Sequence, residues 1–129
     1  EEVGRAVEDA LAALRDGAGG LARLDRAGLL ACGGPGTSLT WMDARVGDRP
    51  VTPRAGKPVE VQALWTAALA LWGRRAEADR AAESFRTRFW FEAGRRLFDV
   101  VDGPGGDDAR MRPNQTSGVA RTSQARRIE

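Results

Sequence analysis

The sequence of 129 residues contains no histidine and no tyrosine, and it has only one cysteine and one lysine. Without histidine, the chain cannot form a Ser–His or Cys–His nucleophile pair, or a histidine-containing metal site, from its own residues. The single Cys32 excludes an internal disulfide and a thiolate metal cluster, and it favours a reducing compartment, for which we predict the cytoplasm. We therefore expect no metal and no cofactor, with Asp and Glu as the groups available for proton chemistry.

Long apolar runs and blocks of one charge are also missing. No segment approaches the roughly 20 apolar residues of a membrane-spanning helix, and the first four residues lack the basic and then apolar pattern of a signal peptide. The 20 basic and 18 acidic residues give a net charge of +2 and alternate along most of the chain. Nucleic-acid binding requires basic residues clustered on one face. We therefore expect neither a membrane nor a nucleic acid as partner.

Apolar periodicity predicts three helices. Residues 3–14 have one apolar stripe and are followed by three glycines that end a helix. A Gly- and Pro-punctuated loop region then covers residues 21–56. From Pro58 to Trp72 nearly every residue is apolar, which is typical of a helix buried on more than one side, whereas residues 76–91 have a single apolar stripe. A buried helix followed by a half-buried one predicts a hairpin of an inner and an outer helix, although an ordinary helical bundle fits as well.

The last third of the chain is less regular. Residues 97–101 are equally typical of a strand and of a buried loop, and residues 103–108 are predicted to be a loop. We expect Asp102, Asp107 and Asp108 to lie in a solvated turn, because their spacing is not that of a calcium loop. Residues 116–129 are polar and basic with little periodicity, so we expect a domain at 1–115 followed by a disordered tail.

Asp43 is the first candidate for chemistry. It follows Trp41 and Met42 in the Gly- and Pro-rich region, where partial desolvation could keep its carboxyl protonated near neutral pH. A protonated acid beside a sugar is what glycoside hydrolysis requires, and the indole of Trp41 offers a face for a pyranose ring. Spacing alone favours the alternative, in which Asp43 forms a structural ion pair with Arg45 or Arg54.

Two further polar groups suit hydroxyl recognition. Lys57 and Glu60 open the apolar helix, where they could bind sugar hydroxyls or orient Asp43, although capping of the helix explains them equally well. The run from Arg112 to Gln115 places a guanidinium and two amides close together. Trp65 and Trp72 lie seven residues apart on one helix face, which favours a place in the core for both.

Motifs in order along residues 28–115 give the chain a resemblance to the glycogen-debranching glycoside hydrolases, the amylo-α-1,6-glucosidases. The segments that carry it are Gly28-Leu29-Leu30, Pro35-Gly36, Leu39-Thr40-Trp41-Met42-Asp43-Ala44, Val46-Gly47-Asp48, Val51-Thr52-Pro53-Arg54, Gly56-Lys57-Pro58-Val59-Glu60, Ala63-Leu64-Trp65, Phe85, Phe89-Trp90, Leu97, Asp99-Val100-Val101-Asp102 and Arg112-Pro113-Asn114-Gln115.

The resemblance implies an all-α fold, part of an (α/α)6 barrel or toroid of inner and outer helices, and inverting hydrolysis of α-1,6-glucosidic branch linkages in glycogen or limit dextrin. It implies that Asp43 is the general acid. The general base of the family is a later glutamate with no counterpart here, so we expect no hydrolysis by this chain alone. The substrate-binding residues that the resemblance implies are Trp41, Arg54, Lys57, Glu60, Arg112, Asn114 and Gln115.

Two other classes of protein remain open from the sequence. In a non-catalytic carbohydrate-binding or helical interaction module, Trp41 and the same arginine and lysine residues could bind carbohydrate without hydrolysing it. An Arg-rich nucleic-acid binder is a weaker third interpretation.

Overall fold

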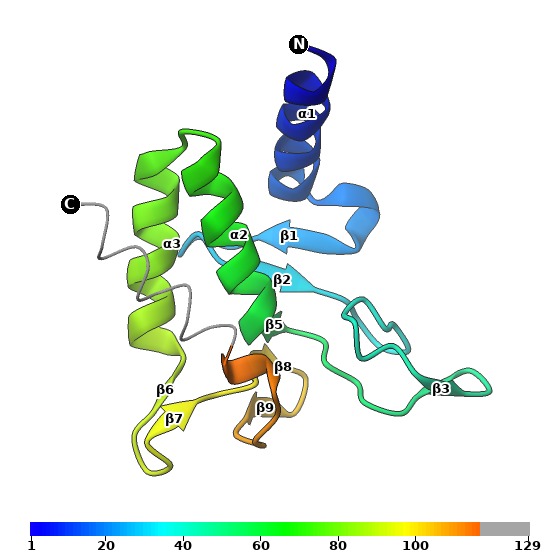
Figure 1. Ribbon diagram of the computed structural model, residues 1–129. Helices are drawn as coiled ribbons and strands as arrows, with labels where there is room; N and C mark the ends of the chain where they lie inside the picture. Colours follow the sequence, from blue (N-terminus) through cyan, green and yellow to red (C-terminus); the bar gives the residue numbers. More distant parts are fainter. Residues whose placement is uncertain (117–129) are drawn as a thin grey trace.

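The structure, a computed structural model, describes residues 1–116 and combines helices with short antiparallel strands (Figure 1). The helices are α1 (Glu2–Asp16), the 3-10 turn η1 (Ala18–Gly20), α2 (Val59–Leu71) and α3 (Arg75–Arg88). The strands are β1 (Ala22–Leu24), β2 (Leu30–Cys32), β3 (Arg45–Val46), β4 (Arg49–Pro50), β5 (Lys57–Pro58), β6 (Trp90–Phe91), β7 (Arg96–Leu97), β8 (Val100–Gly103) and β9 (Gly106–Asp108). They form the pairs β1-β2, β3-β4 and β6-β7, and the three-stranded sheet β5-β8-β9.

The prediction of an all-α fold, as part of an (α/α)6 toroid, is wrong. Of residues 1–116, 41% are helical and 21% lie in antiparallel strands that form several small sheets. Residues 21–56, predicted as loop, contain four of these strands, and the predicted loop at 103–108 contains β9. Strands of two to four residues are too short to display the alternation that identifies a strand in a sequence. They form because tight turns and contacts with distant segments bring them into register.

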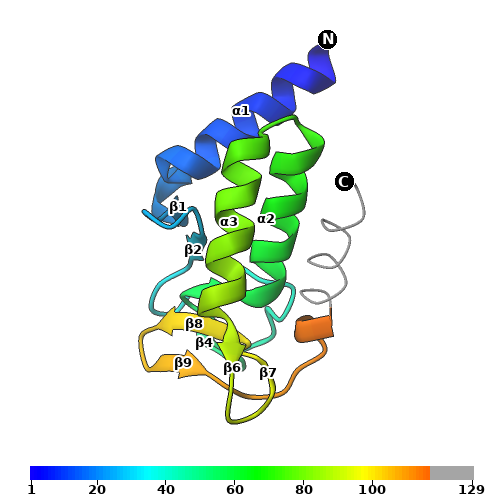
Figure 2. The same ribbon diagram turned by 90° about the vertical axis from the view of Figure 1, so that its left-hand side faces the viewer.

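The three helices predicted from periodicity are present, but the third was predicted to reach residue 91, whereas α3 ends at Arg88 and Trp90–Phe91 form β6. Helix α1 ends where Gly17 adopts a left-handed conformation, with φ of 90°, and its amide caps the helix by donating to Ala13. Leu11 packs with Leu30 of β2 and with core residues of α2 and α3. One turn before Leu11, the ion pair between Glu8 and Arg74 connects the middle of α1 to the residue before α3. Thus α1 lies across one end of the α2–α3 hairpin (Figure 2).

Helices α2 and α3 are antiparallel and lie side by side (Figures 1 and 2). The prediction that α2 is buried on more than one side is wrong, because Leu64 and Leu71 are 56% and 79% exposed. Trp65 is buried, as predicted, and its indole donates to the Gly28 carbonyl, but Trp72 is 38% exposed. None of the helices among residues 1–116 is long and apolar enough to cross a membrane.

A second group of core residues lies where the start of α2 and the end of α3 meet the small sheets. Its buried members are Leu29, Val59, Phe85, Phe89, Leu97 and Val101. The ambiguous segment 97–101 is thus partly extended, because Val100 and Val101 of β8 pair with β5. This pairing needs glycine at position 56, which has φ of 123° and whose added Cβ would lie 2.8 Å from the Val101 carbonyl oxygen.

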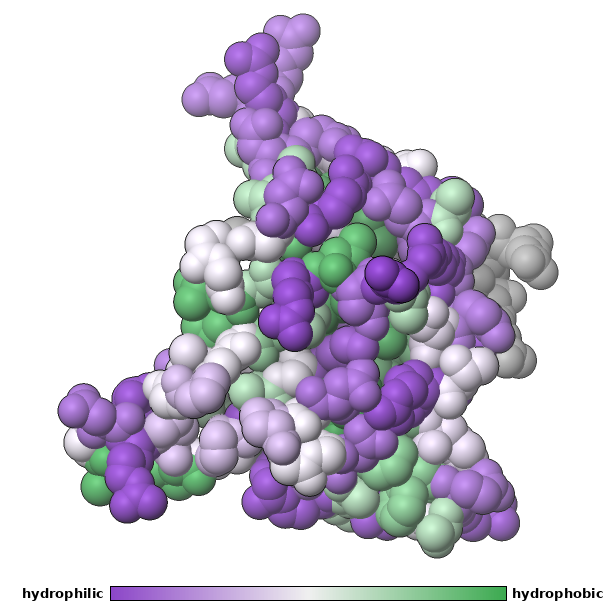
Figure 3. Space-filling model, turned by 180° about the vertical axis from the view of Figure 1, so that it is seen from behind, coloured by the Kyte–Doolittle hydropathy of each residue, from purple (hydrophilic) through white to green (hydrophobic). Residues whose placement is uncertain are grey.

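The β3–β4 hairpin projects from the body of the molecule (Figure 1). It begins after the segment that contains Trp41 and Asp43, and its Val46 is 74% exposed. Seen from behind, the surface mixes hydrophilic areas with small apolar ones and has no continuous apolar face on that side (Figure 3). The predicted polar tail, apart from Thr116, lies outside the residues that the structure describes.

Candidate functional site

A fully buried carboxylate, Asp99, organises the polar residues of the chain. It lies between β7 and β8 with its side chain 0% exposed. Its oxygens accept hydrogen bonds from Arg54 at 2.9 and 3.0 Å, from Asn114 at 3.2 Å, and from Arg112. Arg54 in turn donates to Glu60, with 2.6 Å between Nη2 and Oε2. We call Arg54, Glu60, Asp99, Arg112 and Asn114 the Asp99 network.

The Asp99 network joins four separate segments of the chain. Arg54 comes from the loop before β5, Glu60 from the first turn of α2, and Arg112 and Asn114 from the segment after β9. Its two arginines and two carboxylates balance in charge, as buried ions must. Burial by itself lowers the pKa of the Arg54 guanidinium, but its hydrogen bonds with Glu60 and Asp99 outweigh burial and raise that pKa above its ordinary value. Arg54 therefore stays charged.

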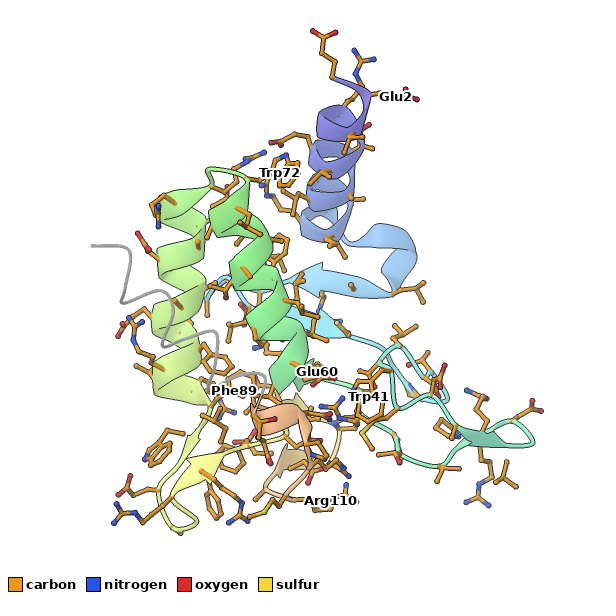
Figure 4. The ribbon with its side chains drawn as sticks, in the orientation of Figure 1. Glu2, Trp41, Glu60, Trp72, Phe89 and Arg110 are labelled. Carbon is orange, nitrogen blue, oxygen red and sulfur yellow. The ribbon has the colours of Figure 1, made fainter. Side chains whose placement is uncertain are left out.

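Trp41 extends the network to the surface. Its indole Nε1 donates to Oδ1 of Asn114 at 2.9 Å, although the residue is 64% exposed. Figure 4 shows Trp41 beside Glu60 at the beginning of α2. Between them lies a surface depression of about 400 Å³, lined by Trp41, Glu60, Ala63, Leu64, Pro113, Asn114 and Thr116. We call it the Trp41 pocket.

The Trp41 pocket has both an apolar and a polar lining. Trp41 and the exposed Leu64 supply apolar surface, while Glu60 supplies carboxylate oxygens that can accept from hydroxyl groups. The structure thus brings together three of the predicted binding residues, Trp41, Glu60 and Asn114. Arg54 and Arg112 lie behind them and hold the carboxylates.

Two of the predicted binding residues are engaged elsewhere. Gln115 donates to the backbone carbonyls of Leu97 and Arg110 at 3.1 and 2.8 Å and thereby anchors the segment after β9. Lys57 is buried between Asp25 and Asp102, with 2.6 Å from its Nζ to Asp102 Oδ2. It borders a different depression, of about 300 Å³. Neither residue lines the Trp41 pocket.

Asp43 lies two residues beyond Trp41 and is exposed, so the expected desolvation of its carboxyl is absent. The alternative of a structural ion pair is not seen either. Arg45 binds oxygens of Gly36, Ser38 and Asp48, and Arg54 belongs to the Asp99 network. Among residues 1–116, Asp43 forms no ion pair. Its side chain is therefore accessible to a ligand.

The prediction of a solvated turn for the later aspartates is confirmed in part: Asp102 and Asp107 are exposed beside the turn between β8 and β9, but the aspartates lie in these strands and form ion pairs. Asp102 binds Lys57 and Arg88, and Arg88 binds Asp107 at 2.8 Å. Asp108 binds Arg110 and Arg112. Asp99 was not among the site residues predicted from the sequence. Its one signal in the sequence is a carboxylate flanked by apolar residues, Phe98 and Val100, in a segment that the resemblance includes.

Acid should destabilise the fold through these aspartates. The hydrogen bond from Lys57 lowers the pKa of Asp102 below its ordinary 3.8 despite partial burial, and Arg88 and Arg110 do the same for Asp107 and Asp108. A carboxyl whose pKa is lowered by folding stabilises the folded protein at pH values above its unfolded-state pKa. This stabilisation is lost as the pH falls toward the folded-state pKa. We expect a melting temperature that is nearly constant from about pH 7 to 5 and falls below about pH 4.

Thermal unfolding followed by circular dichroism checks this expectation. Asp102→Asn should be less stable than the parent near neutral pH and should lose less stability on acidification. Asp48→Asn, in the exposed β3–β4 turn, serves as the matched control. The same pH dependence in the parent and in Asp102→Asn would contradict the role given to Asp102.

The Trp41 pocket combines an exposed aromatic side chain with a carboxylate in an open depression. A family model described as amylo-alpha-1,6-glucosidase matches residues 2–125, and the chain belongs to this family. The resemblance that the motifs predict is thereby confirmed, over a longer stretch than residues 28–115. Comparison with curated proteins and with solved structures gave no match.

Proposed function

We propose that this chain carries the general acid and part of the glucan-binding surface of an amylo-α-1,6-glucosidase, with Asp43 as the acid. The observation that supports it is the Trp41 pocket. There an exposed indole, fixed by its edge to Asn114, stands beside Glu60, and the accessible carboxyl of Asp43 follows two residues later. The ligand we propose is a branched α-glucan, glycogen or limit dextrin, in the cytoplasm.

In the proposed reaction Asp43 donates its proton to the glycosidic oxygen of the α-1,6 linkage as the bond from the sugar's C1 to that oxygen breaks. In an inverting enzyme a second carboxylate activates a water molecule that attacks C1 from the opposite face, with the two carboxyl groups about 6.5–9.5 Å apart. We place this base outside residues 1–116. In this proposal bound glucan covers the exposed Asp43 and brings the glycosidic oxygen to its carboxyl.

The neighbours of Asp43 have binding roles in this proposal. The face of Trp41 receives a glucose ring, and Leu64 continues the apolar wall. Glu60 accepts from Arg54, and its remaining lone pairs can accept from sugar hydroxyls. Because Arg54 stays charged and buried, it holds the Glu60 carboxylate in one orientation before the ligand arrives.

Glucan binding tests this proposal directly. We expect isothermal titration to detect binding of maltohexaose and of branched limit dextrin to the chain. Trp41→Ala should weaken it by at least about tenfold, which corresponds to about 1.4 kcal/mol. Trp90→Ala is the matched control, because Trp90 is also an exposed tryptophan, 47% accessible, but does not line the pocket. Equal affinity in the parent and both variants, or binding of neither sugar by the parent, would sink the proposal.

A further inference from the structure

We infer that Asn114 is a positioning residue, which holds the indole of Trp41 in the orientation that receives a sugar ring and is itself oriented by the buried Asp99. The geometry of the hydrogen bonds carries this inference. Its consequence for sugar affinity rests on the function proposed above.

The orientation of the Asn114 amide is determined by its buried neighbour. The carboxylate of Asp99 only accepts hydrogen bonds, so the group of Asn114 that faces it must be the NH₂, 3.2 Å from Oδ1. The carbonyl oxygen of Asn114 then faces the other way, toward Trp41. An indole Nε1–H only donates, and it lies 2.9 Å from that oxygen. The opposite amide orientation would set oxygen against oxygen on one side and hydrogen against hydrogen on the other.

Asn114 is a buried residue that can restrain the exposed side chain of Trp41. It is 3% exposed, whereas Trp41 is 64% exposed. The next residue, Gln115, anchors the segment by donating to the backbone carbonyls of Leu97, before β8, and Arg110, after β9. The Asn114 NH₂ also lies 3.4 Å from the sulfur of Met42, so one buried amide contacts two consecutive residues of the exposed segment.

Trp41 needs such a contact because packing restrains it little. A ring that is mostly exposed can change rotamer, and binding a sugar on its face then requires ordering the ring at the same time. Fixing a side chain in its bound orientation before the ligand arrives removes that cost. Asn114 therefore acts on glucan affinity through the orientation of Trp41.

The first measurement is the hydrogen exchange of the Trp41 indole N–H by NMR, assigned through its disappearance in Trp41→Phe. We expect slow exchange in the parent and at least about tenfold faster exchange in Asn114→Leu, which keeps the side-chain size and removes both hydrogen bonds. The indole N–H of Trp65, bonded to the Gly28 carbonyl, reports whether the fold survives. Faster exchange at Trp41 alone supports the inference. Fast exchange in the parent, or no change in the variant, overturns it.

The second measurement is a double-mutant cycle on maltohexaose affinity. We expect Asn114→Leu to weaken binding by about threefold to tenfold in the parent and to have no further effect in Trp41→Phe, which has a ring but no indole donor. An equal loss in both backgrounds overturns the inference, because Asn114 would then act independently of the indole N–H. If Asn114→Leu does not fold, Trp41→Phe alone remains informative. It should bind about threefold to tenfold more weakly than the parent, and unchanged affinity overturns the inference.

The two proposals fail in different ways. Absence of sugar binding by the folded parent contradicts the proposed function and leaves the exchange measurement intact. Fast exchange of the Trp41 indole in a parent that binds glucan contradicts the positioning role alone.

Discussion

Replacing Asp99 by asparagine is expected to lower the free energy of unfolding by about 3–5 kcal/mol, because it removes one member of a buried ion network. The carboxylate is 0% exposed and accepts from Arg54, Arg112 and Asn114. An amide at this position has one acceptor oxygen and directs an NH₂ group at guanidinium donors. Arg54 would then keep only Glu60 as a carboxylate partner, and Arg112 only Asp108. Because a domain of this size is stable by only about 5–15 kcal/mol, the loss should be large on that scale.

Urea unfolding followed by circular dichroism measures this effect. Asp48→Asn is the matched control, the same chemical change at an exposed aspartate, and should stay within about 0.5 kcal/mol of the parent. If Asp99→Asn were as stable as Asp48→Asn, the Asp99 network would contribute little to folding. A useful second variant is Arg112→Met, which removes one of the positive charges facing Asp99. It should also be destabilising, because the carboxylate would lose one of its charged donors.

Asp43→Asn is expected to lower the turnover of a complete enzyme by about 10²–10⁴-fold, the usual contribution of a general acid. The experiment replaces the matching segment of a complete amylo-α-1,6-glucosidase with residues 28–115 of this chain and measures glucose released from limit dextrin.

The grafted enzyme also separates catalysis from mere binding. Asp48→Asn in the same graft should leave turnover unchanged, because Asp48 lies in the β3–β4 turn beyond the Trp41 pocket. An active graft that keeps full turnover with Asp43→Asn would exclude Asp43 as the acid and favour a non-catalytic glucan-binding role. The chain by itself should release no glucose. Release by the purified chain would show that it contains a base as well.

The helices were predictable because each depends on neighbours three and four residues away. The apolar stripes of α1 and α3 and the apolar run of α2 are local patterns, and Gly17 is a local stop signal. The family was predictable for a related reason, since its motifs are short sequence segments that occur in a fixed order. Trp41, Glu60 and Asn114 were predicted as binding residues because they lie in those motifs, and in the structure all three line one pocket.

The small sheets and the Asp99 network were not predictable from local pattern. Arg54 and Asp99 are 45 residues apart in the chain, and Trp41 and Asn114 are 73 apart. Nothing near Lys57 in the sequence shows that it pairs with Asp25 and Asp102 instead of facing a ligand. The exposed face of α2 was missed as well, because an apolar run does not show which of its sides another element covers.

The sequence by itself determined which chemistry is open to this protein and where its helices lie. The lack of histidine and of a second cysteine leaves proton chemistry to carboxylates, and helical periodicity is a property of adjacent turns. Only the tertiary structure decided which carboxylates are buried and which remain accessible. Burial and ion pairing depend on segments that meet after folding, and these contacts place Asp99 in the core, Glu60 at the pocket and Asp43 in contact with solvent.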